Sequence, residues 1–361
     1  MNRIKVSIST LGCKSNQYDS SALEDALKGA SLCVVPFPGP ADAYIINTCT
    51  VTGRTDTQSR QLIRKVRRDN PDALVIVTGC YAQVSADEVA AIEGVDFVVG
   101  NPEKARIAEF IKRGRQASPV KELGAWQEGT PWTLRALSSS GRTRATLKIQ
   151  EGCDRACSYC IIPKARGASR SLPLEAVERE IASLVEAGYR EIVLTGIHLG
   201  AYGSDFTEKT SLTTVLEMIE KKDFQCRFRV SSLDPDEVTD ELIDLLKSAK
   251  RVCNHLHLPL QSGDDSIIKK MHRPYTGSLF AEKVEKYLAC RFRIFTYSRF
   301  LSAEERLPPL SRTELNSAPS KNAAKSSASS TCSKEKPSTG RLKEKTSACS
   351  SKKCATKRQG S

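Results

Sequence analysis

The sequence predicts an α/β protein with a parallel-sheet domain, then all or part of a β/α barrel, then a disordered tail. Three observations support this prediction. In the first third of the chain, apolar runs of strand length alternate with helical segments, which favours a parallel sheet covered by helices. Four further strand-and-helix units follow, a pattern typical of a barrel. From Ser311 onwards Ser, Thr, Lys, Ala and Pro dominate, as in disordered segments.

The N-terminal domain is placed at residues 1–115. Its expected strands are 4–8, 43–47, 73–78 and 95–99, and its expected helices are 21–28 and 59–68. The continuous apolar run at 73–78 indicates a strand buried on both faces, and Asn70-Pro71 stops the helix before it. Strands and helices alternating in this way predict a Rossmann-like parallel sheet.

Three cysteines follow three of these strands. They are Cys13, Cys49 and Cys80. Because the carboxyl ends of parallel strands share one edge of a sheet, we expect the three thiols to converge there. Gly12 and Gly79 precede two of them and would let backbone approach a bound group closely. The alternative is that all three are separate small core residues.

The other cysteines have no such placement. Cys33, Cys226, Cys253 and Cys290 are interpreted as ordinary thiols, and Cys332, Cys349 and Cys354 as incidental.

A linker is expected at 116–142 and the second domain at 143–300. Its expected strands are 145–150, 191–195, 226–231 and 255–260, and its helices are 174–186, 212–219, 239–248 and 280–287. A further strand is expected within 288–297. Residues 301–361 are expected to form the disordered basic tail.

The loop after the strand at 145–150 carries Cys153, Cys157 and Cys160. Three thiolates at this spacing can hold three irons of a four-iron cluster and leave the fourth iron open for chemistry. The alternative is a half-built zinc site, which the sequence disfavours because no fourth Cys or His lies nearby at zinc spacing.

Charge and composition limit the cellular compartment and the membrane contacts that can be expected of the protein. The net charge is +13, but residues 311–361 carry twelve basic and three acidic side chains, so most of the excess lies in the tail. No run of eighteen apolar residues predicts a membrane span, and residues 1–10 lack the apolar core of a signal peptide. We therefore expect a cytoplasmic protein without membrane contact, whose 13 cysteines are ligands and thiols rather than disulfides.

Both cysteine sets lie within longer sequence motifs. These are TLGCKSNQ (10–17), NTCTVT (47–52), VTGCYAQ (77–83), QEGCDRACSYCIIP (150–163), ARG (165–167) and HLPLQSG (257–263). With these stretches the chain resembles the methylthiotransferases of the radical S-adenosylmethionine (SAM) superfamily, from about residue 5 to 287. It is most similar to the branch that modifies threonylcarbamoyladenosine beside the tRNA anticodon, at position 37. Sister branches act on isopentenyladenosine in tRNA or on a ribosomal protein.

The resemblance implies two four-iron–four-sulfur clusters and SAM as cofactors. Cys153, Cys157 and Cys160 would hold the SAM cluster, and Cys13, Cys49 and Cys80 the second cluster. The implied reaction attacks an unactivated aromatic carbon–hydrogen bond, so a cofactor must supply the oxidising radical. The implied partners are tRNA, a flavodoxin- or ferredoxin-like one-electron reductant and a sulfur donor.

The resemblance also implies SAM contacts at the ends of the barrel strands. Tyr159 would lie near the adenine, unless it only packs. Thr195 and Gly196 would contact the methionine amino group, and Ser231 and Ser232 the ribose or carboxylate. The same contacts are open to Gln261, Ser262 and Gly263.

Several basic side chains are candidates for binding phosphate. Arg166 and Arg170 would hold substrate phosphate or the SAM carboxylate, or would lie on a solvated face. His257 is interpreted as a satisfied barrel histidine. The helix at 59–68 is the candidate tRNA contact, with a merely solvated face as the alternative. Its charged residues are Arg60, Arg64, Lys65, Arg67 and Arg68.

The chain departs from the family pattern after about residue 287. One strand-and-helix unit and the C-terminal RNA-gripping TRAM domain are expected to be absent, with the basic tail in their place. Three functions remain open from the sequence: a tRNA methylthiotransferase, a protein methylthiotransferase, or a truncated inactive remnant that binds clusters.

Overall fold

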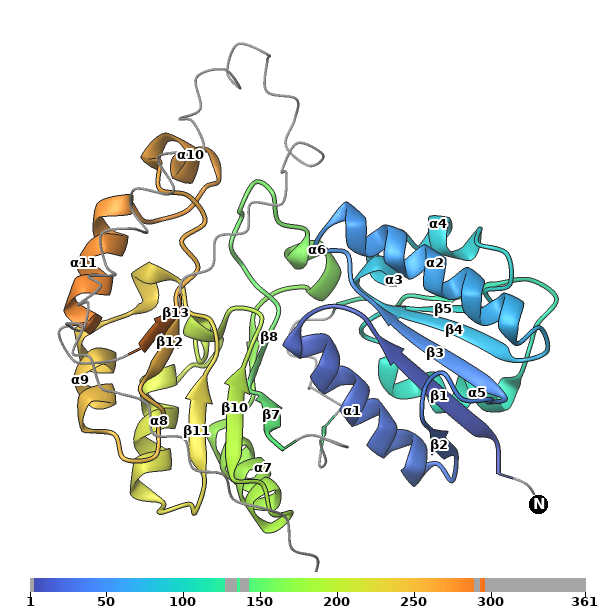
Figure 1. Ribbon diagram of the computed structural model, residues 1–361, viewed down its shortest axis with the longest axis horizontal. Coiled ribbons are helices and arrows are strands. Elements are labelled where there is room, and N and C mark those ends of the chain that lie inside the picture. Colours follow the sequence, from blue (N-terminus) through green and yellow to red (C-terminus); the bar gives the residue numbers. More distant parts are fainter. Residues whose placement is uncertain (1–2, 127–134, 137–142, 289–292, 296–361) are drawn as a thin grey trace, which may run out of the picture. The chain divides into compact units, whose positions relative to one another are not determined.

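The computed structural model describes residues 3–126, 135–136, 143–288 and 293–295 (Figure 1). Its N-terminal part is a six-stranded sheet in the order β2-β1-β3-β4-β5-β6, in which every neighbouring pair is parallel. The strands are β1 (Lys5–Thr10), β2 (Cys33–Val35), β3 (Ala43–Thr48), β4 (Leu74–Gly79), β5 (Phe97–Val99) and β6 (Val120–Glu122). The order places β1, β3 and β4 side by side at the centre.

Helices cover both faces of this sheet (Figure 1). They are α1 (Lys14–Gly29), α2 (Gly53–Asp69), α3 (Cys80–Val84), α4 (Ala86–Ala90) and α5 (Ile107–Arg113), with a 3₁₀ turn, η1 (Lys104–Arg106), before α5. In β3, Ile45 packs with α1 and α5, whereas Ile46 packs with α2, α3 and α4. Since successive strand residues face opposite sides, a strand buried on both faces is apolar over most of its length, as the sequence pattern predicts.

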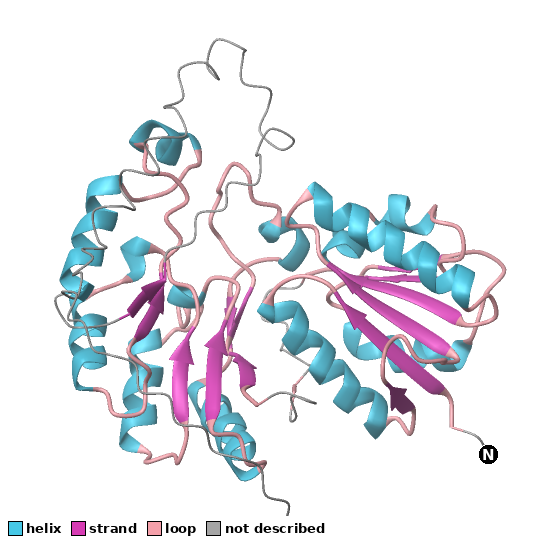
Figure 2. Cartoon of the chain, viewed as in Figure 1, coloured by secondary structure: helices cyan, strands magenta, loops and turns pink. Residues whose placement is uncertain are grey.

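The second part is an arc of parallel strands with helices outside it (Figure 2). The strands are β7 (Ala145–Lys148), β10 (Glu191–Thr195), β11 (Arg227–Val230), β12 (His255–His257) and β13 (Arg293–Phe295), and β8 (Gln150–Glu151) pairs antiparallel with β9 (Arg170–Ser171). Bridges from Phe228 to Val252 and from Ser232 to His257 join β11 to the β12 segment. The arc therefore runs β7-β10-β11-β12-β13.

The helices of this part bury apolar faces against the strands. They are α6 (Ile162–Arg166), α7 (Leu174–Glu186), α8 (Leu212–Lys221), α9 (Asp240–Ser248), α10 (Asp265–Lys270) and α11 (Gly277–Leu288), with 3₁₀ turns η2 (Leu199–Ala201) and η3 (Pro235–Glu237). Ser211 and Thr239 accept backbone hydrogen bonds at the starts of α8 and α9, which fixes where these helices begin. Val177, Leu216 and Leu242 then join one core with the strands.

The α/β class and the parallel N-terminal sheet are confirmed, but several predicted boundaries are wrong. Helix α1 begins at Lys14 rather than 21, because polar residues of its first turns are buried through hydrogen bonds instead of apolar contacts. Strand β6 lies inside the predicted linker, so the N-terminal sheet extends to Glu122. Strand β12 ends at His257, before the predicted 260. The sequence prediction also omitted β2, β9, α3, α4, α5, α6 and α10.

Other predictions about this end of the chain stay predictions. Strand β13 falls within the segment expected to hold a further strand and pairs in parallel with β12. This pairing does not test whether a unit is absent. The predicted tail, 301–361, lies outside the described residues, and so does Cys290. None of the helices that the structure describes is both long and apolar enough to span a bilayer.

Candidate metal centres

Cys13, Cys49 and Cys80 lie at one end of the N-terminal sheet. Cys13 is the N-cap of α1, Cys49 follows β3, and Cys80 opens α3 directly after β4. The register aligns Thr10 with Asn47 and Asn47 with Thr78, so the chain leaves all three strands at the same level. Burial, together with the nearby thiols of Cys80 and Cys13, raises the pKa of Cys49 to about 11. The structure thus brings the three cysteines together, as the strand pattern predicts.

Two glycines leave room beside these thiols. Gly12 has a φ of +104°, and a Cβ on it would lie 2.5 Å from the Cβ and 2.7 Å from the Sγ of Cys49. Gly79 has a φ of +99°, and its Cβ would lie 2.2 Å from the carbonyl oxygen of Thr48. Three soft thiols against bare glycine backbone form a donor set that fits an iron–sulfur cluster.

Replacing Gly12 by Ala is expected to disturb this centre. The positive φ would cost on the order of 1–3 kcal/mol, and the contact with Cys49 would displace a ligand side chain. We expect a lower urea midpoint and less iron bound after anaerobic reconstitution. Gly29→Ala is the matched control, because a Cβ there meets no atom within 4 Å. Equal iron contents in the two variants would contradict this account of Gly12.

The second set, Cys153, Cys157 and Cys160, lies in the loop between β8 and α6. The loop is closed by a backbone hydrogen bond of 3.0 Å from Cys153 to Gly167, and one of 3.0 Å from Cys160 to Cys157 forms a turn. Burial raises the pKa of Cys160, and the thiols of Cys157 and Cys153 add to that effect. The three thiols of this loop therefore influence one another electrostatically.

A histidine that the sequence argument overlooked lies beside this loop. His198 Nδ1 is 3.6 Å from the Sγ of Cys153, although 45 residues separate them. Burial opposes the charged imidazole, but hydrogen bonds to Cys153 and Glu237 raise the pKa of His198 to about 9. In the metal-free protein these contacts therefore favour the protonated imidazole at neutral pH.

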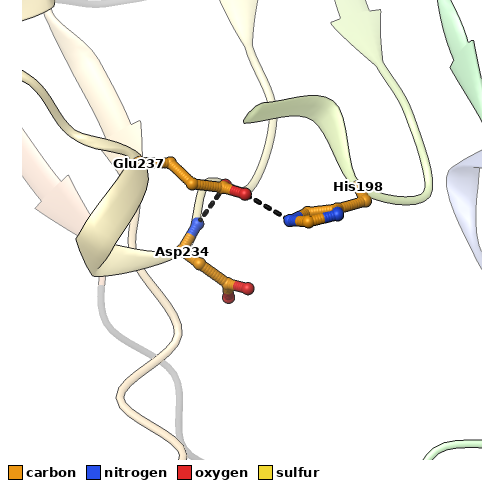
Figure 3. A group of neighbouring side chains, drawn as sticks. All are labelled: His198, Asp234 and Glu237. Carbon is orange, nitrogen blue, oxygen red and sulfur yellow. Dashed lines mark hydrogen bonds and ion pairs between the residues drawn. The ribbon is translucent and has the colours of Figure 1, made fainter. Parts of the chain in front are cut away.

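His198, Asp234 and Glu237 form a compact group that could hold a metal ion by its donor atoms alone (Figure 3). Two guanidinium groups already occupy these carboxylates. Arg273 Nη1 donates to Asp234 over 2.5 Å, and Arg155 Nη2 donates to Glu237 over 3.2 Å. The group is therefore an ion-pair network along the cysteine loop rather than a cation site.

The His198–Glu237 pair is expected to make the metal-free protein sensitive to pH. Because the folded pKa of His198, about 9, lies above the ordinary 6.5, the pair stabilises fully below about pH 6.5 and loses this contribution as pH rises through 9. NMR titration of the imidazole would measure the shift. Glu237→Gln is expected to lower the pKa of His198, and an unchanged pKa in this variant would contradict the assignment.

The predicted SAM contacts lie at the carboxyl ends of neighbouring strands. Thr195 ends β10, with Gly196 next to it, and Ser231 and Ser232 follow β11. The Ser231 hydroxyl lies 3.4 Å from the Thr195 hydroxyl. Residues 261–263, which include Gln261, Ser262 and Gly263, lie beyond the end of β12. These positions share one edge of the arc, and their contacts with SAM remain predictions.

Two more predicted residues have partners in the protein. The hydroxyl of Tyr159 accepts hydrogen bonds from Arg273, 2.7 Å from Nη2 and 3.0 Å from Nε. His257 Nδ1 lies 2.6 Å from the Ser232 hydroxyl, which agrees with a satisfied barrel histidine.

The basic residues separate into exposed and internal ones. On α2, Arg64, Lys65 and Arg68 are exposed, whereas Arg60 donates to the Tyr81 hydroxyl over 3.0 Å. Arg67 is half-buried, with Nε 3.0 Å from the Gly94 carbonyl oxygen and Nη2 2.8 Å from Asp96. Its guanidinium therefore joins α2 to the loop before β5.

The two arginines after the cysteine loop differ from each other. Both expectations for Arg166 are wrong: it is only 1% exposed and binds the carboxylates of Glu151 and Asp19, so it meets neither solvent nor an external phosphate. Arg170 lies over the ring of Trp126, 4.3 Å from its centroid. Its predicted phosphate or carboxylate contact remains a prediction.

Two family models match the chain. The model of uncharacterized protein family UPF0004 matches residues 5–100, and that of the radical SAM superfamily matches residues 147–300. The fold is similar to the radical SAM methyltransferase TsrM from Kitasatospora setae, with a TM-score of 0.58 at 16% identity over 81% of this chain and 67% of TsrM. The arc of strands is thus a radical SAM fold.

Relatives of known name define the family more narrowly. The threonylcarbamoyladenosine tRNA methylthiotransferases MtaB of Bacillus subtilis and Aquifex aeolicus are 42% and 39% identical to this chain over 78% of its length. The alignments cover 63% and 68% of those proteins. A tRNA-2-methylthio-N(6)-dimethylallyladenosine synthase of Carboxydothermus hydrogenoformans is 35% identical over 78% of the chain and 66% of that protein. The chain belongs to the radical SAM methylthiotransferase family of the MtaB type.

Proposed function

We propose that this protein is a radical SAM tRNA methylthiotransferase that adds a methylthio group to C2 of N6-threonylcarbamoyladenosine in tRNA. The main support is the pair of three-cysteine sets: Cys13, Cys49 and Cys80 follow three parallel strands, and Cys153, Cys157 and Cys160 share the loop between β8 and α6. The substrate rests on the MtaB relatives, since the synthase of Carboxydothermus hydrogenoformans carries the name of a different adenosine. The chain spans less than two thirds of the Bacillus subtilis relative, so the activity needs a direct test.

Each cysteine set would hold one four-iron–four-sulfur cluster. A radical SAM cluster supplies, when bound with SAM, the oxidising power to remove hydrogen from an unactivated carbon. Cys153, Cys157 and Cys160 leave one iron position open for SAM, and Arg155 and Arg273 fix the carboxylates beside that loop. Cys13, Cys49 and Cys80 would hold the second cluster, which would carry or donate the sulfur.

The strand ends around the first set would bind SAM. Thr195 and Gly196 offer backbone and hydroxyl groups for the methionine amino group, and Ser231 and Ser232 do so for the ribose or carboxylate. Gln261 to Gly263 would complete this edge. Tyr159 would present its ring to the adenine, held by the hydrogen bonds from Arg273 to its hydroxyl. A fixed aromatic ring loses little freedom when a ligand binds.

The exposed side chains of α2 are the proposed tRNA contact. Arg64, Lys65 and Arg68 lie on the helix that follows the Cys49 loop, where phosphates of a bound RNA would attract them. A flavodoxin- or ferredoxin-like protein would deliver electrons, and a separate donor would replace the sulfur consumed. A tRNA substrate would place the protein in the cytoplasm.

The experiment is nucleoside mass spectrometry of tRNA from cells that lack their own methylthiotransferases and express this chain. The expected product is 2-methylthio-N6-threonylcarbamoyladenosine, absent when Cys153 is replaced by Ala. If the product were methylthiolated isopentenyladenosine instead, the protein would belong to the sister branch. A modified ribosomal peptide would identify a protein substrate. No product in the presence of two bound clusters would identify an inactive remnant.

A further inference from the structure

Five charged side chains are buried together between the two cysteine sets. Asp19 of α1 and Lys104 of η1 belong to the N-terminal part, and Lys148 of β7, Glu151 of β8 and Arg166 of α6 to the second part. All five are less than a tenth exposed. Asp19 accepts hydrogen bonds from Lys104 over 2.8 Å and from Lys148 over 2.5 Å. Three cations thus face two carboxylates.

Arg166 uses only part of its guanidinium in this network. Nη1 donates to both oxygens of Glu151, over 2.8 Å and 3.0 Å, and Nη2 donates to Asp19 over 3.1 Å and also to Asn16 Oδ1. Its Nε is buried and has no hydrogen-bond partner in the described part of the chain. A buried donor without a partner costs on the order of 1–3 kcal/mol. Such an atom indicates a missing acceptor.

The surroundings of Arg166 indicate where that acceptor lies. Its partner Asn16 donates through Nδ2 to the carbonyl oxygens of Leu11 and Thr48, over 2.8 Å and 2.9 Å. Leu11 lies two residues before Cys13, and Thr48 directly precedes Cys49. Helix α6, which ends at Arg166, packs on α3, which begins at Cys80. Arg166 therefore lies among all three loops of the N-terminal set.

Electrostatics agree with this placement. Burial opposes the charge of Arg166, yet Glu151 and then the Cys80 thiol, followed by Asp19 and the Cys13 thiol, keep the pKa of its guanidinium well above the ordinary value. Gly167, the next residue, accepts the backbone hydrogen bond of Cys153. One short segment therefore lies beside both cysteine sets.

We propose that Arg166 is a positioning residue for the iron–sulfur group of Cys13, Cys49 and Cys80, and that its free Nε–H donates a hydrogen bond to a sulfur of that group. This proposal rests on the proposed function, which assigns a cluster to these cysteines. A hydrogen bond to a cluster sulfur stabilises the reduced state and raises the reduction potential. The second domain would thereby tune the cluster of the first.

The test uses the full chain with Cys153, Cys157 and Cys160 replaced by Ala, so that the measured EPR signal comes only from the cluster of Cys13, Cys49 and Cys80. Arg166→Lys keeps the charge and removes the Nε–H donor. Lys104→Met removes an equally buried charge of the same network and leaves the donor in place. We expect Arg166→Lys to shift the midpoint potential, measured by EPR-monitored titration, to a more negative value, and Lys104→Met to shift it less.

A potential in Arg166→Lys equal to that of the parent would overturn the proposal and leave Arg166 a structural residue. If Arg166→Lys fails to fold, pulsed EPR of the reduced parent with ¹⁵N-labelled arginine decides instead. A ¹⁵N coupling is expected, and its absence would overturn the proposal. A parent that binds no iron at this set would refute the proposed function first, and this inference with it.

Discussion

Replacing Cys153, Cys157 and Cys160 together by Ala is expected to lower the iron content from about eight to about four per chain. The three thiols share one loop and would hold one cluster, while Cys13, Cys49 and Cys80 follow three different strands and would keep theirs. The methylthiolated nucleoside is expected to disappear completely, because no side chain can replace the oxidising cofactor. Iron and sulfide analysis after anaerobic reconstitution measures the first effect, and nucleoside mass spectrometry measures the second.

The matched control replaces three cysteines that belong to neither set. Cys33, Cys226 and Cys253 are all free thiols, so this control removes the same number of sulfurs. Its iron content is expected to equal that of the parent. About four irons or fewer in the parent, unchanged when the 153–160 set is removed, would mean that the SAM cluster does not assemble. The protein would then be a remnant.

The predictable part of the fold follows from apolar patterning. Residues 43–47 and 73–78 predict β3 and β4 because a strand covered on both faces is apolar over most of its length. The same patterning predicts the convergence of Cys13, Cys49 and Cys80. Parallel neighbouring strands must end along one edge, so a residue just after each strand lies near the others.

The apolar pattern of the sequence does not predict which charged residues are buried. Asp19, Lys148 and Arg166 lie far apart in the sequence, and charged residues are usually exposed, so nothing local marks them as partners. The same reason explains why Arg166 was assigned to phosphate or solvent. His198 was missed because its approach to Cys153 depends on the turn after β10.

The first turns of α1, which the sequence prediction missed, illustrate the same point. Its first two turns carry Asn16 and Asp19, whose side chains bind backbone and buried cations, so no apolar period marks the helix there. In the sequence, only the motif TLGCKSNQ (10–17) distinguishes this segment from an ordinary loop. Residues that hold a site in place are thus harder to predict than residues that fill a core.

Replacing Asp19 by Asn is expected to produce the largest loss of stability. Asp19 is the only carboxylate that pairs with all three buried cations, Lys104, Lys148 and Arg166, in the described structure. Asn keeps the shape but leaves three cations facing Glu151 alone. Removing one partner from a buried ionic group costs about 3–5 kcal/mol. Urea unfolding of the metal-free chain at pH 7 measures this loss.

The acid dependence of stability gives an independent check on the same residue. Burial alone would raise the pKa of Asp19, but Lys104, Lys148 and Arg166 outweigh it and hold the pKa well below 3.8. The carboxylate therefore stabilises the fold fully above its unfolded pKa, and this contribution disappears as pH falls through the depressed folded value. Asp19→Asn is expected to lose less stability than the parent on acidification.

Asp244→Asn is the control for both measurements. Asp244 pairs with Lys247 over 2.7 Å on the exposed side of α9, with 72% of its side chain accessible. Surface pairs of this kind contribute little, so its urea midpoint should stay close to that of the parent. If Asp19→Asn were no less stable than Asp244→Asn, the five buried charges would not form the network that joins the two cysteine-bearing parts. The proposed role of Arg166 would then lack the scaffold that holds its guanidinium in place.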